Sequence, residues 1–301
     1  MKGARILVTG ATSQVGLPIA RALARENTVY GLGRLRREQE GKLLEDIGVT
    51  PVAADLVSDD FAALPQKLDY VLNFAVVKTG DFDHDLAANV EGVGRLMSRC
   101  AGVKAFLHCS STAVYQPNGH HAFKETDPLG DNHRAIFPTY SICKIAAESM
   151  VKFGARQWGI PSTIARLNVP YGDNGGWPAF HLEMILGRMV IEVGAEGPSV
   201  YNLIHEDDYI RMIPRLLDVA STTATVVNWG GSEEATIEEW CAYMSRLVGV
   251  DAKLAASAHA LTSVRIDTTR MHELIGRTEV SWRDGIRRLV KARHPELALR
   301  A

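Results

Sequence analysis

The chain has 301 residues, of which 46% are hydrophobic and 23% charged, and its formal net charge at pH 7 is −2. This is the composition of an ordinary globular protein with a large buried core. The near-neutral charge gives no electrostatic reason to expect a nucleic acid or an anionic membrane as partner. No apolar run approaches the roughly 20 residues that a membrane-spanning helix needs.

The N-terminal sequence and the cysteines bear on the cellular compartment. The apolar stretch that follows Arg5 is too short for the core of a signal peptide. No two cysteines have the C-x-x-C spacing, and their wide separation is typical of reduced thiols rather than of a disulfide framework. We therefore expect a cytoplasmic protein. The cysteines are Cys100, Cys109, Cys143 and Cys241.

In the first half of the chain, short apolar runs alternate with longer amphipathic ones. This alternation predicts right-handed βαβ crossovers and a doubly wound parallel sheet covered by helices on both faces, a Rossmann-like α/β fold. The expected strands are 5–9, 28–32, 49–53, 70–75, 105–108 and 162–167, and the expected helices are 15–25, 83–100 and 140–157.

After Gly172 the pattern changes. A Gly- and Pro-rich stretch precedes a mixture of helices and short strands. We expect residues 1–170 to form a dinucleotide-binding domain and residues 171–301 a smaller mixed substrate lobe, some segments of which return to the sheet. The expected helices are 179–189, 207–219, 236–248 and 281–292, and the expected strands are 200–204 and 225–229.

The first expected strand runs directly into a glycine-containing loop. Binding a pyrophosphate requires a tight turn, accessible backbone amides and a helix N-terminus aimed at the anion. Gly10 can supply the turn and Gly16 the close helix–sheet contact, while Ser13 stands where a third glycine is usual and adds a hydroxyl donor. The position between strand and helix favours a dinucleotide site. The loop residues expected to contact the cofactor are Gly10, Thr12, Ser13, Gln14, Val15 and Gly16.

The end of the second expected strand bears on which cofactor is used. An Asp or Glu there would bind the ribose 2′-hydroxyl of NAD, but this sequence has Gly33 followed by Arg34. A guanidinium can bind a 2′-phosphate, which a carboxylate would repel; the alternative is that Arg34 belongs to a solvated basic helix start. We expect NADP(H), with NAD(H) as the alternative. Asp55 and Leu56, after the third strand, are expected to meet the adenine ring.

Three residues carry the expected chemistry. Tyr140 and Lys144 are four apart and so share one face of a helix. Moving a tyrosine pKa from about 10 to about 7 requires roughly 4 kcal/mol of preferential phenolate stabilisation, which a lysine ammonium and the positive charge of a bound nicotinamide can supply. Ser111 would then hydrogen-bond to the substrate oxygen. We predict that these three residues are catalytic.

Jointly, these motifs resemble the extended short-chain dehydrogenase/reductases, the NAD-dependent epimerase/dehydratase family, over nearly the whole chain. The resemblance implies an NAD(P)-dependent oxidoreductase or epimerase, selects Ser111 as the catalytic serine, and implies a homodimer formed through the helices at 83–100 and 140–157. The matching segments are 9–16, 55–56, 73–75, 89–92, 110–115, 140–144, 166–172, 205–208 and 228–231. The expected cofactor contacts also include Phe74, Ala75, Val76, Lys78, Asn89, Cys109, Tyr140, Lys144, Leu167 and Val169.

Three departures from the family concern the substrate. Thr112 and Ala113 replace the Asp-Glu pair of sugar-nucleotide 4,6-dehydratases, which argues against water elimination by their route. Tyr201 stands where nucleotide-sugar enzymes often have a diphosphate-binding Arg, and Val169 where they have Asn. The loss of an Arg–diphosphate contact favours a small non-nucleotide substrate. The arginines that could replace the lost charge are Arg134 and Arg211.

Several residues are expected near this substrate. The pair His133-Arg134 could reach a carboxylate or phosphate or could lie in a solvated loop. The pair His120-His121 lacks a third ligand at recognisable spacing, so we expect no metal. The residues expected to form a partly apolar pocket wall are Trp177, Phe180, His181 and Met184.

Three functional hypotheses follow. The first is an oxidoreductase that transfers a hydride to or from a carbonyl or alcohol carbon. The second is a sugar or nucleotide-sugar epimerase that keeps NAD tightly bound. The third is a catalytically silent NADP(H)-sensing protein, against which the complete set of Ser111, Tyr140 and Lys144 argues, because a sensor does not need an activated tyrosine.

Overall fold

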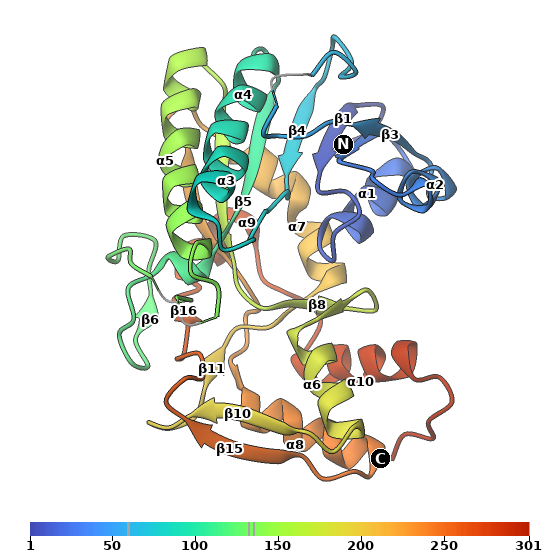
Figure 1. Ribbon diagram of the computed structural model, residues 1–301, viewed down its shortest axis with the longest axis vertical. Coiled ribbons are helices and arrows are strands. Elements are labelled where there is room, and N and C mark those ends of the chain that lie inside the picture. Colours follow the sequence, from blue (N-terminus) through green and yellow to red (C-terminus); the bar gives the residue numbers. More distant parts are fainter. Residues whose placement is uncertain (59–60, 132, 135, 301) are drawn as a thin grey trace.

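The computed structural model describes residues 1–58, 61–131, 133–134 and 136–300. Its centre is a seven-stranded sheet in which every neighbouring pair is parallel (Figure 1). The doubly wound parallel sheet expected from the sequence is therefore confirmed. Along the sheet the strands are β13 (Thr225–Trp229), β7 (Ser162–Leu167), β5 (Ala105–Ser111), β4 (Tyr70–Asn73), β1 (Arg5–Thr9), β2 (Thr28–Gly33) and β3 (Val49–Ala53).

Helices cover both faces of this sheet. In β1, Ile6 and Val8 pack into one hydrophobic core together with α1 (Gly16–Ala24), α7 (Glu206–Asp218) and α9 (Thr269–Ile275). Leu7 points the other way, into a second core with α4 (Gly92–Arg99) and α5 (Tyr140–Trp158). Successive strand residues point to opposite faces, so a strand buried on both sides is expected to have consecutive apolar residues, as the run at 6–8 does.

The prediction of one continuous helix over 83–100 is wrong. The structure has three consecutive helical segments there: α3 (Phe82–Leu86), a π-helical turn (Ala87–Glu91) and α4. The turn contains Asn89, whose side-chain amide accepts from the backbone N of Val77 at 2.8 Å and donates to its carbonyl oxygen at 2.7 Å. Such local widening of a helix is frequent at functional sites, and here it brings one helical side chain against the segment that follows β4.

The lower part of the molecule in Figure 1 has its own hydrophobic core. Two of its elements differ from those expected from the sequence. The helix expected at 179–189 starts earlier, with Pro178 in its first turn where a missing N–H is harmless, and stops before Gly187. The strand expected at 200–204 is two strands, which pair with different partners. The helices are α6 (Trp177–Leu186), α8 (Ile237–Val248) and α10 (Trp282–Arg293), and the strands are β10 (Val190–Gly194), β11 (Val200–Tyr201), β12 (Ile204–His205), β14 (Ala235–Thr236) and β15 (Lys253–Ser257).

Short elements complete the chain, and some of them were not expected from the sequence. The helix α2 (Glu38–Asp46) connects β2 and β3, and a single helical turn follows β5. Over the residues that the structure describes, no helix is long and apolar enough to cross a membrane. The remaining elements are η2 (Thr112–Val114), β6 (Ala122–Phe123), β8 (Pro170–Gly172), β9 (Gly175–Gly176) and β16 (Arg265–Ile266).

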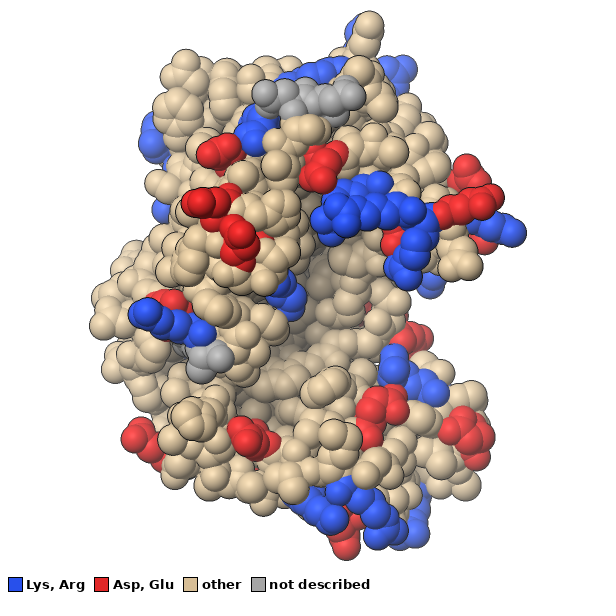
Figure 2. All heavy atoms as spheres, in the orientation of Figure 1, with Lys and Arg blue, Asp and Glu red and all other residues tan. Residues whose placement is uncertain are grey.

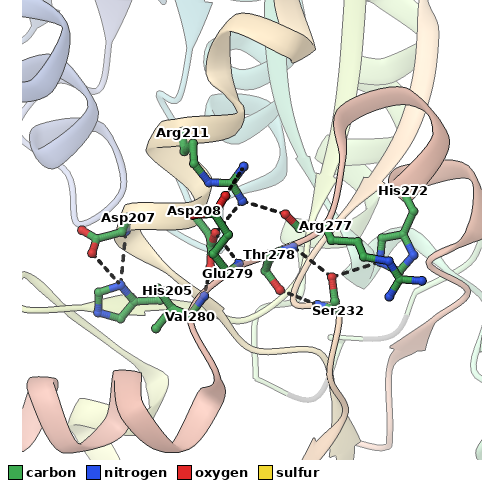
Figure 3. A network of polar contacts seen from close by, with 10 residues as sticks. All are labelled: His205, Asp207, Asp208, Arg211, Ser232, His272, Arg277, Thr278, Glu279 and Val280. Atoms are coloured by element: carbon green, nitrogen blue, oxygen red, sulfur yellow. Dashed lines mark hydrogen bonds and ion pairs between the residues drawn. The ribbon is translucent and has the colours of Figure 1, made fainter.

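A polar network joins the start of α7 to the connection between α9 and α10 (Figure 3). The buried carboxylate of Asp208 accepts from the backbone N of Glu279 at 2.8 Å and of Val280 at 2.9 Å. The Arg211 guanidinium donates to Asp208 at 2.7 Å and to the Arg277 carbonyl oxygen at 2.6 Å. Arg211 is therefore fully engaged within this network.

Candidate active site

A cavity of about 550 Å³ lies where β1, β4, β5 and β7 end. Ligands of open α/β sheets bind at the carboxyl ends of the strands, and Figure 2 shows the molecule hollowed between its upper and lower parts. Twelve of the expected site residues line this cavity. They are Ser13, Gln14, Val15, Phe74, Val76, Lys78, Cys109, Ser111, Tyr140, Lys144, Leu167 and Val169.

The other expected residues lie outside the lining of this cavity, some beside it in sequence and others at the ends of β2 and β3 or on the helix after β4. They are Gly10, Thr12, Gly16, Gly33, Arg34, Asp55, Leu56, Ala75 and Asn89. Sequence reasoning missed part of the lining, although four of the missed residues are direct neighbours of expected ones in the sequence. The missed lining residues are Ser110, Thr112, Phe137, Asn168, Pro170 and Val264.

The loop after β1 has the geometry of a phosphate-binding turn. Gly10 has φ +63°, which favours glycine, and a Cβ atom there would lie 2.9 Å from the backbone N of Ala75. A Cβ atom on Gly16 would overlap the Gly10 carbonyl oxygen. The Ser13 hydroxyl accepts from the backbone N of Gly16 at 3.0 Å, which leaves its own proton available to a ligand. The loop thus fits a dinucleotide pyrophosphate at the N-terminus of α1.

At the end of β2, Arg34 is exposed and forms no ion pair or hydrogen bond with another described residue. Arg37 differs, since its guanidinium binds the Glu40 carboxylate at 2.7 Å. Of these two arginines, Arg34 is the one able to receive a ligand. At the end of β3, the Asp55 carboxylate accepts from the backbone N of Val57 at 3.1 Å.

Tyr140 begins α5, and Lys144 lies one turn later. The buried Lys144 ammonium donates to the Cys109 carbonyl oxygen at 2.7 Å and lies 6.0 Å from the centroid of the Tyr140 ring. Burial raises the pKa of Tyr140 to about 12, although a hydrogen bond with Ser111 acts in the opposite direction. Burial also lowers the pKa of Lys144. The protein by itself therefore does not lower the tyrosine pKa, and the decrease expected for catalysis would have to come with a bound cationic group.

Two buried side chains hold the segment after β4 against the start of α5. The Asp85 carboxylate accepts from the Thr139 hydroxyl at 2.6 Å and from the backbone N atoms of Thr79 and Gly80 at 2.9 and 3.1 Å. Asn89 binds the backbone of Val77, as described above. Sequence reasoning missed Asp85, whose signal was its place one turn before Asn89 on the expected helix.

A buried ion pair lies next to β5, the strand that ends in Ser111. The Arg166 guanidinium donates to both carboxylate oxygens of Glu148, at 2.9 and 2.8 Å. Glu148 also accepts from the Ser110 hydroxyl at 2.6 Å. The pair joins β7, α5 and β5, and so fixes the strand that presents Ser111 relative to the helix that presents Lys144.

The wall of the cavity that belongs to the lower lobe is aromatic. Trp177 lines it, with its ring centroid 5.1 Å from that of Tyr201. The Tyr201 hydroxyl donates to the Thr262 carbonyl oxygen at 2.8 Å. Of the four wall residues expected from the sequence, only Trp177 is in the lining. The other three are Phe180, which is 64% exposed, His181, which is buried behind Trp177, and Met184, which packs against the lobe's core.

The charged groups of the cavity are few. Among the described lining residues, Lys78 and Lys144 are the cationic side chains, and there is no Arg, Asp or Glu. Arg134 is exposed and outside the lining, and Arg211 is engaged elsewhere. The described residues contain no cluster of three metal-ligating side chains, and His121 instead binds the Asp127 carboxylate at 2.7 Å.

The chain is similar in sequence to a known enzyme family. A family model described as the NAD dependent epimerase/dehydratase family matches residues 6–230. A dTDP-glucose 4,6-dehydratase of Mycobacterium tuberculosis (strain ATCC 25618 / H37Rv) is 26% identical over 239 residues, which cover 71% of this chain and 69% of the relative.

Solved structures share the fold. A UDP-glucuronic acid 4-epimerase from Bacillus cereus, in complex with UDP-glucuronic acid and NAD, is 21% identical with a TM-score of 0.81, covering 96% of this chain and 98% of that one. MoeE5 in complex with UDP-glucose and NAD is 20% identical with a TM-score of 0.82, covering 98% and 100%. A UDP-N-acetylglucosamine 4-epimerase from Methanobrevibacter ruminantium M1 is 18% identical with a TM-score of 0.83, covering 99% and 100%.

Proposed function

Since the chain belongs to the NAD dependent epimerase/dehydratase family, we propose that it is an enzyme that uses NADP(H) to oxidise or reduce a carbonyl or alcohol carbon of a small, non-nucleotide substrate. The observation that carries this proposal is that Ser111, Tyr140 and Lys144 line the same cavity as the glycine loop after β1. Membership of an enzyme family also sets aside the silent-sensor hypothesis.

The roles of the chain's own groups follow from their positions. A bound nicotinamide dinucleotide would supply the hydride acceptor or donor. The Ser111 hydroxyl binds and orients the substrate oxygen, and the Tyr140 phenol gives a proton to that oxygen or takes one from it. The Lys144 ammonium, one turn away, favours the phenolate form by its charge.

The cofactor would be held by the glycine loop and by the segments at the ends of β2, β3 and β4. NADP(H) is proposed over NAD(H) because Arg34 is exposed and unpaired among the described residues, next to Gly33, where an acidic residue would select NAD. Asn89 acts indirectly, since its side chain fixes Val77. NAD remains the alternative cofactor, in line with the NAD bound in the structural neighbours.

A nucleotide substrate is disfavoured by the charge of the cavity. A diphosphate carries at least two negative charges, and burying them unpaired would cost several kcal/mol. The Tyr201 hydroxyl is bonded to a backbone carbonyl, Val169 is apolar, and Arg211 is engaged in another network. Calorimetric titration with UDP, GDP and dTDP in the presence of cofactor tests this, and micromolar binding of any of them would restore a nucleotide-sugar substrate.

The second candidate is an epimerase that retains NAD, which is favoured by the names of the structural neighbours. The two candidates differ in what happens to the cofactor. An epimerase would retain its dinucleotide through purification and would not consume it during turnover, whereas the oxidoreductase would change the nicotinamide absorbance in proportion to product. Turnover with hydroxy acids, aldoses and cyclic alcohols, followed by that absorbance, separates them.

The organisation of the protein is also a proposal. We infer a division at residue 170 between the dinucleotide-binding domain and the substrate lobe, and a cytoplasmic location, which the four buried free thiols support.

A homodimer would form on the outer face of α4 and α5. That face exposes Phe153 and Ile142 and has a hollow of about 650 Å³ lined in part by Trp158. Light scattering of the wild type and of Phe153→Asp tests the dimer.

The decisive variant for the catalytic proposal is Tyr140→Phe. Loss of the phenol proton should lower kcat by about 10²–10⁴-fold while leaving cofactor affinity nearly unchanged, because the ring that remains still packs. Lys144→Ala should lower both. Tyr243→Phe, on α8 and outside the cavity lining, is the matched control. A Tyr140→Phe protein that kept more than half of the wild-type kcat would show that another group transfers the proton.

A further inference from the structure

The side of the cavity next to Tyr140 carries a cation held over an aromatic ring. The Lys78 ammonium lies 4.0 Å from the centroid of the Phe137 ring. The Phe137 and His133 rings lie 6.1 and 5.8 Å from the Tyr140 ring, centroid to centroid. All four residues line the cavity. A positive charge is thus held beside the proposed acid/base group.

The position of this cation is fixed by its backbone. On one side of Lys78, both backbone groups of Val77 are bonded to Asn89. On the other side, the backbone N of Thr79 is bonded to Asp85. The contact with the Phe137 face orients the ammonium without neutralising it. The chain therefore holds Lys78 in a defined place although the residue is exposed to the cavity.

Among the residues that the structure describes, no carboxylate balances the charge of Lys78. The ammonium forms no ion pair with any residue that the structure describes, and no described lining residue is acidic. Burial and the charge of Lys78 lower the pKa of His133 to about 4, so its ring is neutral at physiological pH. The site presents one positive charge beside one neutral, polar ring.

The part of the lining that comes from the lower lobe is apolar. Trp177, Tyr201 and Val264 line it, and the Tyr201 hydroxyl is bonded to a carbonyl behind the wall rather than facing a ligand. Lys144, the other cation of the lining, is buried and donates to the Cys109 carbonyl oxygen, so Lys78 is the cation left to pair with the charge of a substrate. One such cation together with an aromatic wall matches a ligand with one negative charge and an apolar body. A phosphate dianion would call for more donors than the Lys78 ammonium provides.

We propose that Lys78 binds the carboxylate of the substrate, and that this enzyme acts on small carboxylic acids whose apolar ring or chain packs against Trp177. The inference rests on the proposed function, because it names the substrate class of the same cavity. It also gives Lys78 a role different from the cofactor contact that the family resemblance implies.

The test compares benzoate with its uncharged analogue benzamide by calorimetric titration, with and without NADP⁺. Benzoate should bind the wild type about tenfold to hundredfold more tightly than benzamide, the range for one charge-assisted contact. Lys78→Met should bring this ratio to about one, whereas Lys78→Arg should retain most of it. Lys67→Met, which removes an exposed lysine outside the cavity, should leave the ratio unchanged.

Other outcomes overturn the proposal. The proposal is wrong if the wild type binds benzoate and benzamide equally. It is also wrong if Lys78→Met has an unchanged circular dichroism spectrum and still prefers benzoate. The affinity for NADP⁺, measured on the same variants, separates the remaining cases. A loss of NADP⁺ binding in Lys78→Met as large as the loss of benzoate binding would make Lys78 a cofactor ligand. If the wild type bound no dinucleotide, the proposed function would fail, while the titrations without cofactor would still decide the role of Lys78.

Discussion

Replacing Arg34 by alanine should change the cofactor preference without disturbing the fold. The side chain is exposed at the end of β2 and has no partner among the described residues, so its removal breaks no internal contact. Only NADP(H) carries a 2′-phosphate that the guanidinium could bind. The loss should therefore fall on NADP(H) and leave NAD(H) almost unaffected.

The size of the effect follows from the exposure of Arg34. A hydrogen bond between charged groups contributes about 1.5–3 kcal/mol, and the lower end applies here because solvent and salt weaken an exposed contact. At about 1.4 kcal/mol per factor of ten, the Kd for NADPH should rise roughly tenfold. The same change should be more marked at low ionic strength, where screening is weaker.

The assay is a fluorescence titration of NADPH and NADH against wild type, Arg34→Ala and Arg37→Ala. The second variant is the matched control, because the Arg37 guanidinium is already held by Glu40. We expect Arg37→Ala to bind both cofactors as the wild type does. Equal weakening of NADPH and NADH in Arg34→Ala would show that the residue is structural, and a wild-type preference for NADH would refute the NADP(H) proposal altogether.

Three further predictions concern groups around the cavity. In the free protein Tyr140 should still be protonated at about pH 10, the ordinary tyrosine pKa, because burial raises its pKa to about 12, and NADP⁺ should move its ionisation to lower pH; phenolate absorbance of the wild type minus that of Tyr140→Phe measures this, and an unchanged titration with NADP⁺ bound would contradict it. Asn89→Ala removes the two hydrogen bonds to Val77, so denaturant unfolding should show a loss of about 1–3 kcal/mol together with weaker cofactor binding. The pKa of buried His181 is lowered from 6.5 to about 4, so the unfolded chain takes up its proton first and the free energy of unfolding should fall as the pH drops from about 6.5 to about 4; His181→Asn, which can still accept from Trp240, should show a smaller fall, and an identical pH profile would exclude this cause.

Much of the fold could be predicted because it depends on strands buried on both faces. Such strands are continuous apolar runs, and Ile6, Leu7 and Val8 show why, since they alternate between the two cores. The strand β15 was missed because it is exposed along almost its whole length, so its sequence lacks both the long apolar run and the alternation of a buried strand. The π-helical turn was missed because Asn89 is held by a loop partner, which helical periodicity does not reveal.

Residues of the candidate site could be predicted best where they come soon after a strand in the sequence. Residues within a few positions after a strand, such as Ser13 and Phe74, line the cavity because the carboxyl ends of parallel strands meet at one edge. The contact between Lys78 and Phe137 joins two segments far apart in sequence, so no local pattern could indicate it. Arg211 was a reasonable candidate by position alone, but its engagement with Asp208 depends on the tertiary fold. The chemical roles of all these residues remain predictions.

The place of β13 at the edge of the sheet has a consequence for how the chain folds and how it can be divided. The strand comes from the second half of the sequence, yet it pairs along its full length with β7, whose six residues are all buried. A fragment ending before β13 would leave β7 as an unpaired edge whose normally buried side chains and backbone groups are exposed, which is a site for aggregation. A stable fragment ending at residue 170 is therefore not expected. The seven-stranded sheet can be completed only after most of the polypeptide has been synthesised.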